Sequence, residues 1–191
     1  MLIVLEILSV CCNFIYLYFA IKQQPKAWLF GVAAAILSFF LFYSLNLNGS
    51  AWLNIVYALQ GLFGFLQWQF IKKYDAPDFR LKLKDHLFLI GFILMVFLIS
   101  LLGLKAHKLN NIAKLDVLLA LLCVLTTFLE IKKETACWYY WIVLNSLYTV
   151  LYSYQELYGY ALMMLGFGVF SIWALKEWTS KKSMQPIPLS E

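Results

Sequence analysis

The chain has 191 residues, of which 63% are hydrophobic, and its mean hydropathy is +0.78. Charged residues make up only 13% of it, about half the share of a soluble domain, so a soluble enzyme is all but excluded. A disordered protein would need the opposite composition. The apolar runs are continuous, without the short alternating segments of a β-barrel. The composition therefore predicts an all-α, polytopic membrane protein.

Seven apolar segments, extended by Trp and Tyr at their ends, are long enough to cross a hydrocarbon core of ~30 Å. In chain order, the predicted membrane helices are 2–21, 28–44, 52–71, 87–104, 115–131, 138–154 and 158–175. The first contains Glu6 and Asn13 and follows no basic region. We therefore expect a retained helix there and not a cleaved signal peptide.

The basic residues predict an orientation. A net charge of +5 would suggest nucleic acid in a soluble protein, but in a membrane protein Lys and Arg collect in cytoplasmic loops. With the N-terminus outside, all but three of the 15 Lys and Arg residues lie on the inner side. We therefore expect a multi-pass protein of the bacterial inner membrane with its C-terminus in the cytoplasm and no nucleic-acid partner.

An internal repeat appears when the sequence is shifted by 110 residues. Trp28 then falls on Trp138 and Trp68 on Trp178, and the order of helices matches. Each copy has three helices, and 87–104 is a linker, so the prediction is a 3+1+3 arrangement of parallel repeats. The predicted divisions are 1–86 for the first repeat and inner loop, 87–114 for the linker helix and outer loop, and 115–191 for the second repeat and cytoplasmic tail.

A polar and aromatic stripe marks the sixth helix. Its members, at steps of three and four residues, are Trp138, Trp141, Asn145, Tyr148 and Tyr152. Such a face could stack on a ring, attract a cation and hydrogen-bond a polar edge. The alternative is an aromatic interface belt with ordinary packing.

The repeat counterparts of that stripe are mostly small residues, which would leave the space that a pocket requires: Trp28, Gly31, Ala35, Ser38 and Phe42. Ordinary small-residue helix packing is the alternative. On the third helix, Asn54 and Gln60 are candidates for the substrate pathway.

Signals for an enzyme are missing from the sequence. The two histidines, His86 and His107, are expected in loops, and no catalytic triad, metal cluster or phosphate-binding glycine motif occurs. The four cysteines have no metal spacing and are expected to pack as small apolar residues. We expect no catalytic site, no metal and no cofactor.

A family resemblance rests on the sixth helix. The run Trp138-Tyr139-Tyr140-Trp141 followed by Asn145 resembles the W-x-x-W-x-x-x-N pattern of PnuC-type vitamin transporters. The segment 154–158 resembles the turn before the last helix of that family, and 64–68 resembles its G-W-x-x-W ending with one Trp replaced. The resemblance covers about residues 2–182.

The resemblance implies facilitated diffusion of an unphosphorylated vitamin, which a cytoplasmic kinase then traps, and a homotrimer with one pore in each protomer. Known members carry nicotinamide riboside or thiamine, and others riboflavin or deoxynucleosides. Together with the residues selected above, the predicted substrate-binding residues are Trp138, Trp141, Asn145, Tyr148, Trp28, Asn54 and Gln60.

The substrate is left open by departures from the nicotinamide riboside pattern. Ala33-Ala34-Ala35 stands where an Asn is expected, and Asn54 stands where a Gln is expected. A sugar needs several hydrogen bonds, so thiamine is slightly favoured over nicotinamide riboside. A non-transporting scaffold subunit, a lipid-modifying membrane enzyme and a sugar transporter of the SWEET type remain as alternatives.

Overall fold

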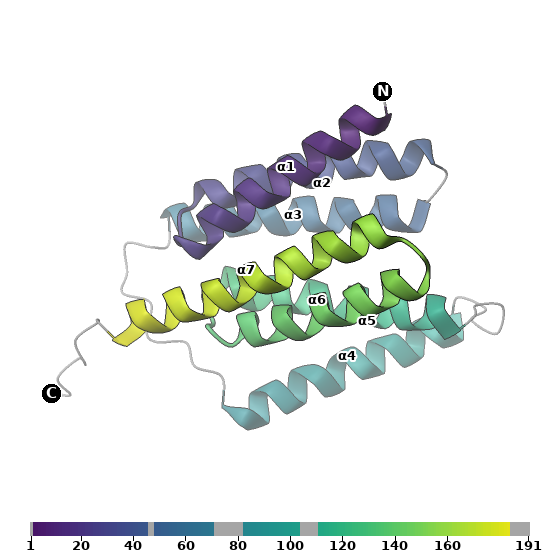
Figure 1. Cartoon of the computed structure of the whole chain (residues 1–191). Helices are drawn as coiled ribbons and strands as arrows, with labels where there is room; N and C mark the ends of the chain where they lie inside the picture. The colour runs from purple at the N-terminus through teal and green to yellow at the C-terminus, as the bar shows by residue number, and fades with distance from the viewer. Residues whose placement is uncertain (1, 46–47, 71–81, 104–110, 184–191) are drawn as a thin grey trace, which may run out of the picture. The chain divides into compact units, whose positions relative to one another are not determined.

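The computed structural model describes residues 2–45, 48–70, 82–103 and 111–183. These residues form seven α-helices and no strand (Figure 1). The helices are α1 (Leu2–Ile21), α2 (Lys26–Ser44), α3 (Asn48–Phe70), α4 (Leu83–Gly103), α5 (Asn111–Ile131), α6 (Cys137–Tyr154) and α7 (Tyr158–Ser183).

All seven predicted segments are helical, and the differences lie at their ends. Helix α4 begins at Leu83 and α5 at Asn111, each four residues before the predicted start, and α7 runs on to Ser183. The prediction counted apolar residues only, whereas polar and charged residues continue a helix without difficulty once it has left the hydrocarbon. The predicted ends at residues 71 and 104 lie outside the described residues.

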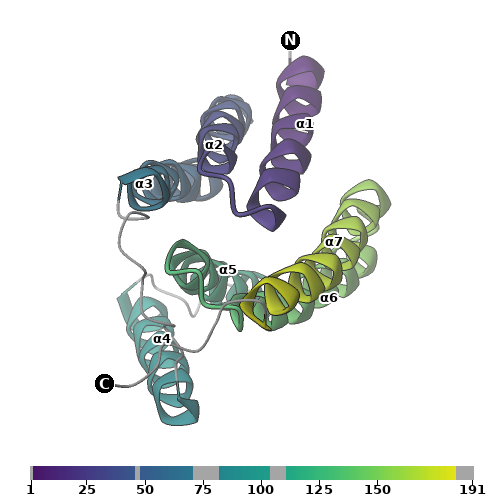
Figure 2. The same ribbon diagram turned by 90° about the vertical axis from the view of Figure 1, so that its left-hand side faces the viewer.

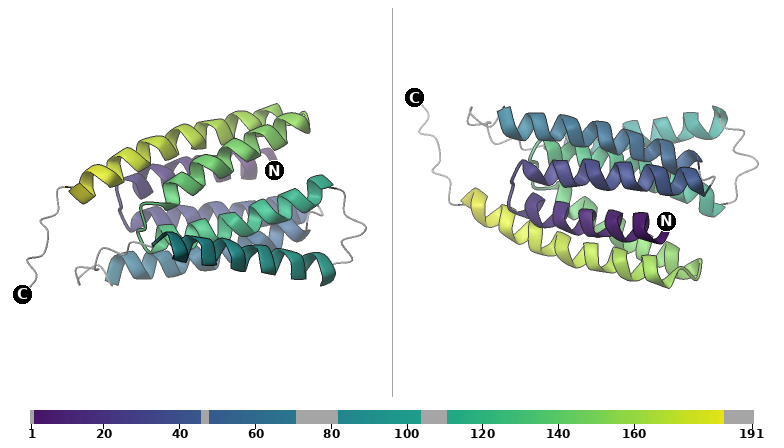
Figure 3. Two further views of the ribbon diagram at one scale, coloured as in Figure 1. Left: turned by 90° about the horizontal axis from the view of Figure 1, so that it is seen from below. Right: turned by 90° about the horizontal axis from the view of Figure 1, so that it is seen from above.

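The chain divides into two units, Met1–Pro77 and Asp78–Glu191. In the first, α2 packs against both α1 and α3 (Figure 2). In the second, α6 packs along α7, and α5 contacts α6 and α4 (Figure 3). The aromatic–Asn stripe of α6 therefore belongs to a unit that also contains α5 and α7.

Four of the helices are long and apolar enough to cross a membrane: α1, α2, α5 and residues Tyr158–Lys181 of α7. Large apolar side chains cover the outside of the described helices, for example Ile3 at 70%, Phe88 at 73% and Leu162 at 70% exposed. An apolar surface of this extent needs lipid around it. The chain is a multi-pass membrane protein, and for α3, α4 and α6 the prediction of a span stays a prediction.

The loop after α1 and the loop after α5 have the same backbone. Gln23 has φ 57° and Lys133 has φ 56°, both in the left-handed region, although neither is glycine. The N–H group of the following residue makes the same hydrogen bond in both loops. Gln24 N donates to Phe19 O at 3.0 Å, and Glu134 N donates to Leu129 O at 3.0 Å. This is the Schellman pattern of hydrogen bonds that ends a helix. It recurs at the 110-residue offset.

The same offset relates two pairs of tryptophans in the core. Trp28 of α2 meets Trp68 of α3 edge to face, with ring centroids 5.2 Å apart at 85°. Trp138 of α6 meets Trp178 of α7 at 5.2 Å and 84°. All four side chains are 1% exposed. Each pair fixes how the second and third helices of its repeat pack together.

Candidate functional site

The stripe on α6 faces the interior of the protein. Its five members are buried or half-buried, whereas Tyr139, Val143 and Val150 on the opposite side are between 57% and 68% exposed. A helix that turns its polar side inward and its apolar side outward is arranged for a membrane, because polar groups are costly to expose to lipid. The side chains that could meet a polar solute therefore lie on the protein side of α6.

The tryptophans of the stripe differ in how much surface they leave uncovered. Trp138 and its repeat counterpart Trp28 are each 1% exposed, with a ring face or edge occupied by the paired indole. Among the described residues, neither indole N–H finds an acceptor. Trp141 is only half-buried. Of the three indoles predicted to bind substrate, Trp141 therefore offers the most free surface.

Trp141 is oriented by a buried carboxylate. Its Nε1–H donates a hydrogen bond of 2.9 Å to Oε2 of Glu130. Glu130 lies in the last turn of α5 and is 1% exposed. Glu130 was not among the predicted site residues, although an acidic residue inside the predicted span 115–131 is a signal for a functional site.

Asn145 has a partner on the neighbouring helix. Its Nδ2 lies 3.4 Å from Oγ of Ser171 on α7, and Ser171 Oγ donates to Phe167 O at 2.8 Å. Asn145 is 7% exposed and Ser171 is 1% exposed. Ser171 was not among the predicted site residues.

The first unit lacks this polar pair. The counterparts of Asn145 and Ser171 at the 110-residue offset are Ala35 and Gly61. A Cβ atom at Gly61 would lie 2.7 Å from Cγ2 of Val32, so α2 and α3 approach too closely there for a serine. The two repeats therefore differ in chemistry at equivalent positions.

The small-residue stripe of α2 is occupied within its own unit. A Cβ atom at Gly31 would lie 3.1 Å from the ring of Tyr16 on α1. Ser38 Oγ lies 2.6 Å from Ser9 Oγ, which also donates to Ala34 O at 3.3 Å. Within the first unit, these small residues allow α1 to pack closely.

The remaining predicted site residues make contacts along their own helices. Tyr148 stacks on Tyr152 along α6, with ring centroids 5.6 Å apart. Asn54 donates to Ser50 O of its own helix at 2.8 Å, and Gln60 is half-buried on the same helix. Six residues separate Asn54 and Gln60, which places them about a third of a turn apart around α3.

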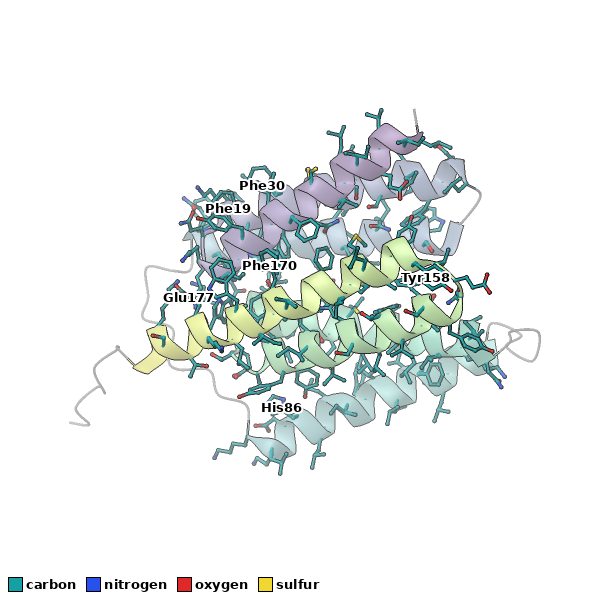
Figure 4. All side chains as sticks on the ribbon, viewed as in Figure 1. Phe19, Phe30, His86, Tyr158, Phe170 and Glu177 are labelled. Carbon is teal, nitrogen blue, oxygen red and sulfur yellow. The ribbon has the colours of Figure 1, made fainter. Side chains whose placement is uncertain are left out.

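One histidine lies elsewhere than the sequence predicted. His86, expected in a loop, lies in the first turns of α4 because that helix begins at Leu83 (Figure 4). Its Nδ1 is 3.0 Å from the hydroxyl of Tyr140 on α6. The predicted loop position of His107 lies outside the described residues.

Comparisons with known proteins place the chain in a family. The family model described as nicotinamide mononucleotide transporter matches residues 3–180. A solved structure described as the vitamin B3 transporter PnuC is similar in fold, with a TM-score of 0.70 and 20% sequence identity over 92% of this chain and 80% of that chain. No curated protein matches. Because the family model spans nearly the whole chain, this protein belongs to the nicotinamide mononucleotide transporter family, and the resemblance seen in its sequence is confirmed.

Proposed function

We propose that the protein is a membrane transporter that imports an unphosphorylated vitamin by facilitated diffusion. A cytoplasmic kinase then traps the vitamin by phosphorylation. Membership of the nicotinamide mononucleotide transporter family supports the transport of a small solute, and the fold resembles that of a vitamin B3 transporter. The sequence carries no nucleotide-binding motif that would couple transport to ATP.

The proposed architecture is seven membrane helices in a 3+1+3 arrangement of parallel repeats, with the N-terminus outside and three protomers in each assembly. Its support within the chain is the 110-residue offset, which relates the turns at Gln23 and Lys133 and the two tryptophan pairs. The distribution of Lys and Arg supports the orientation. The homotrimer rests on the family resemblance.

The proposed binding site rests on Trp141 and Asn145, which lie on the same inward face of α6. Residues four apart on a helix lie one above the other, so a half-buried indole and a buried amide are neighbours. The indole offers a face for stacking, and the amide offers both a donor and an acceptor. A flat heteroaromatic ring with a polar edge is the solute that suits this combination.

The other predicted residues have supporting roles in this proposal. Tyr148 continues the aromatic face along α6. Asn54 and Gln60 supply polar groups from α3. Trp28 and Trp138 act from the core by holding their helix pairs in place.

Thiamine is slightly favoured over nicotinamide riboside as the substrate. Both carry a positively charged ring, but a ribose needs several hydrogen-bonding groups. The first unit has Ala35 and Gly61 where the second has Asn145 and Ser171, so it offers fewer of them. The stripe contains no Lys or Arg that could pair with a phosphate, so the phosphorylated vitamins are expected to be rejected.

Binding to the purified protein tests the site. Thiamine, nicotinamide riboside, riboflavin and thiamine pyrophosphate are titrated against wild type, Trp141→Ala, Asn145→Ala and the control Tyr139→Ala. Tyr139 is an aromatic residue of the same helix that is 61% exposed on the opposite side. Loss of the indole face removes roughly 1–2 kcal/mol of binding free energy, which weakens binding about 5- to 30-fold, and loss of the amide is expected to weaken binding similarly.

The expected pattern is binding of thiamine or nicotinamide riboside, weaker binding by both stripe variants, and unchanged binding by the control. If wild type binds none of the four compounds, the vitamin assignment is wrong. If both stripe variants bind as wild type does, the stripe is structural.

A further inference from the structure

A buried acidic side chain beside the stripe plays no part in the function argued so far. Glu130 is 1% exposed at the end of α5, and its Oε2 accepts the Trp141 indole N–H at 2.9 Å. A carboxylate is costly to bury in a membrane protein. It is also unfavourable at a helix C-terminus, where the helix dipole is negative. A residue with these costs needs a reason to be there.

The internal repeat shows that the helix end does not need Glu130. Its counterpart in the first unit is Ala20, which is 0% exposed at the end of α1. The turns that follow have the same left-handed residue and the same hydrogen bonds. An alanine therefore serves the packing and the turn equally well.

The indole of Trp141 does not need a carboxylate either. Trp28 and Trp138 keep their indole N–H groups buried without an acceptor among the described residues, so this fold tolerates that arrangement. The counterpart of Trp141 in the first unit is Gly31. The first unit therefore has no counterpart of the Glu130–Trp141 pair. It has no counterpart of Asn145 either, because Ala35 stands at that position.

We propose that Glu130 is a specificity-determining residue that gives the site its preference for a positively charged ring. The inference rests on the proposed function, because it takes the face of Trp141 as the surface on which the ring stacks. Accepting the indole N–H holds that face in place and pushes electron density into the ring, which strengthens its attraction for a cation. The negative charge of the Glu130 carboxylate also attracts the cationic ring directly, across the width of the Trp141 indole.

Three charged residues, Lys132, Lys133 and Glu134, follow Glu130 closely in the chain. The Lys132 ammonium group, in the turn after α5, lies 5.6 Å from the centroid of the Phe128 ring of that helix. Glu134, 5% exposed, adds a second carboxylate, whose Oε1 accepts the Ala136 N–H at 3.2 Å. Glu134 is thus engaged with the turn after α5, whereas Glu130 accepts a hydrogen bond from the stripe, so Glu134 is a suitable control.

The test compares a charged ligand with a neutral one of the same shape. Binding to the purified protein is measured for whichever of thiamine and nicotinamide riboside wild type takes, and for its isostere in which carbon replaces the positively charged ring nitrogen. The variants are Glu130→Gln, Glu130→Asp and the control Glu134→Gln. Glutamine keeps an oxygen that can accept the Trp141 N–H but removes the charge.

We expect wild type to prefer the charged ligand, and Glu130→Gln to lower that preference roughly tenfold, the size expected for one charge acting across a partly screened site. Glu134→Gln should keep the wild-type preference. Glu130→Asp should keep the preference while binding both ligands more weakly, because its charge remains but its reach is shorter.

Two results would overturn the inference while leaving the proposed function standing. In the first, wild type binds the neutral isostere as tightly as the charged vitamin, a result that needs no variant. In the second, Glu130→Gln weakens both ligands equally, which would make Glu130 a positioning residue for Trp141 only. If wild type binds neither vitamin, the proposed function fails, and this inference fails with it.

Discussion

Replacing Gly64 with alanine should destabilise the packing of α2 on α3. A Cβ atom at this position would lie 2.5, 2.6 and 2.8 Å from Cδ2, Cε2 and Cε3 of Trp28. Carbon atoms in favourable contact are about 3.5–4.0 Å apart, so the indole or the helix has to move by roughly 1 Å. Trp28 is 1% exposed and held edge to face against Trp68, which leaves it little freedom to turn aside.

The expected cost follows from two opposing effects. Overpacking a close-packed site costs about 1–3 kcal/mol, whereas replacing glycine by alanine inside a helix contributes up to about 1 kcal/mol in favour of folding. Gly91→Ala on α4 is the matched control, because a Cβ atom there meets nothing within 4 Å. The difference between the two variants isolates the packing cost of about 1–3 kcal/mol.

The second repeat shows what relief is possible. The counterpart of Gly64 is Ala174, which is 0% exposed, yet its tryptophan pair keeps a centroid distance of 5.2 Å. A Cβ atom can therefore be accommodated beside a tryptophan pair of this geometry. This places the expected cost toward the lower end of the range and not at the loss of folding.

The assay is the apparent melting temperature of the purified protein in one detergent, followed by intrinsic fluorescence. Gly64→Ala should melt below Gly91→Ala, and Gly91→Ala should melt at or above wild type. If Gly64→Ala melts at the same temperature as Gly91→Ala, the close approach of Gly64 to Trp28 does not exist in the folded protein.

Three further predictions test the turns, the polar pair and the topology. Gln23→Gly should raise the melting temperature by the equivalent of about 0.5–1 kcal/mol, because glycine adopts the left-handed backbone without strain. A melting temperature below that of wild type would contradict the left-handed conformation of residue 23. Ser171→Ala should cost about 1 kcal/mol in the same assay by removing the partner of Asn145, and no loss would show that the 3.4 Å contact is not a hydrogen bond. In a cysteine-free background, a Cys at Asn111 should react with an impermeant reagent on intact cells and one at Lys84 should not, and the reverse would overturn the orientation.

The sequence predicted the helices well because long apolar runs in a membrane protein leave few alternatives to a helix. It also predicted the offset of 110 residues, and the turns at Gln23 and Lys133 share one geometry at that offset. The helix ends were less predictable. His86 was placed in a loop because the apolar run begins at Leu87, but the helix starts at Leu83, since its first turns do not need to be apolar.

The spacing of residues in the sequence could not predict the contacts within the candidate site. Spacing alone put Trp138 and Trp141 on one stripe but could not show that Trp178 covers one of them. That difference depends on which residue of α7 lies opposite, which is a property of helix packing. Glu130 was missed because the pattern could not show its partner, and its burial against Trp141 appears only when α5 and α6 are placed together.

Uptake into liposomes that contain the purified protein tests the central claim most directly. Labelled thiamine or nicotinamide riboside is supplied outside, with no ATP, kinase or ion gradient present. The account predicts entry that is faster than into protein-free liposomes, that stops at equal concentrations on the two sides, and that does not occur for thiamine pyrophosphate. Failure to carry either vitamin, or accumulation above equal concentrations when a proton or sodium gradient is imposed, would contradict facilitated diffusion of an unphosphorylated vitamin.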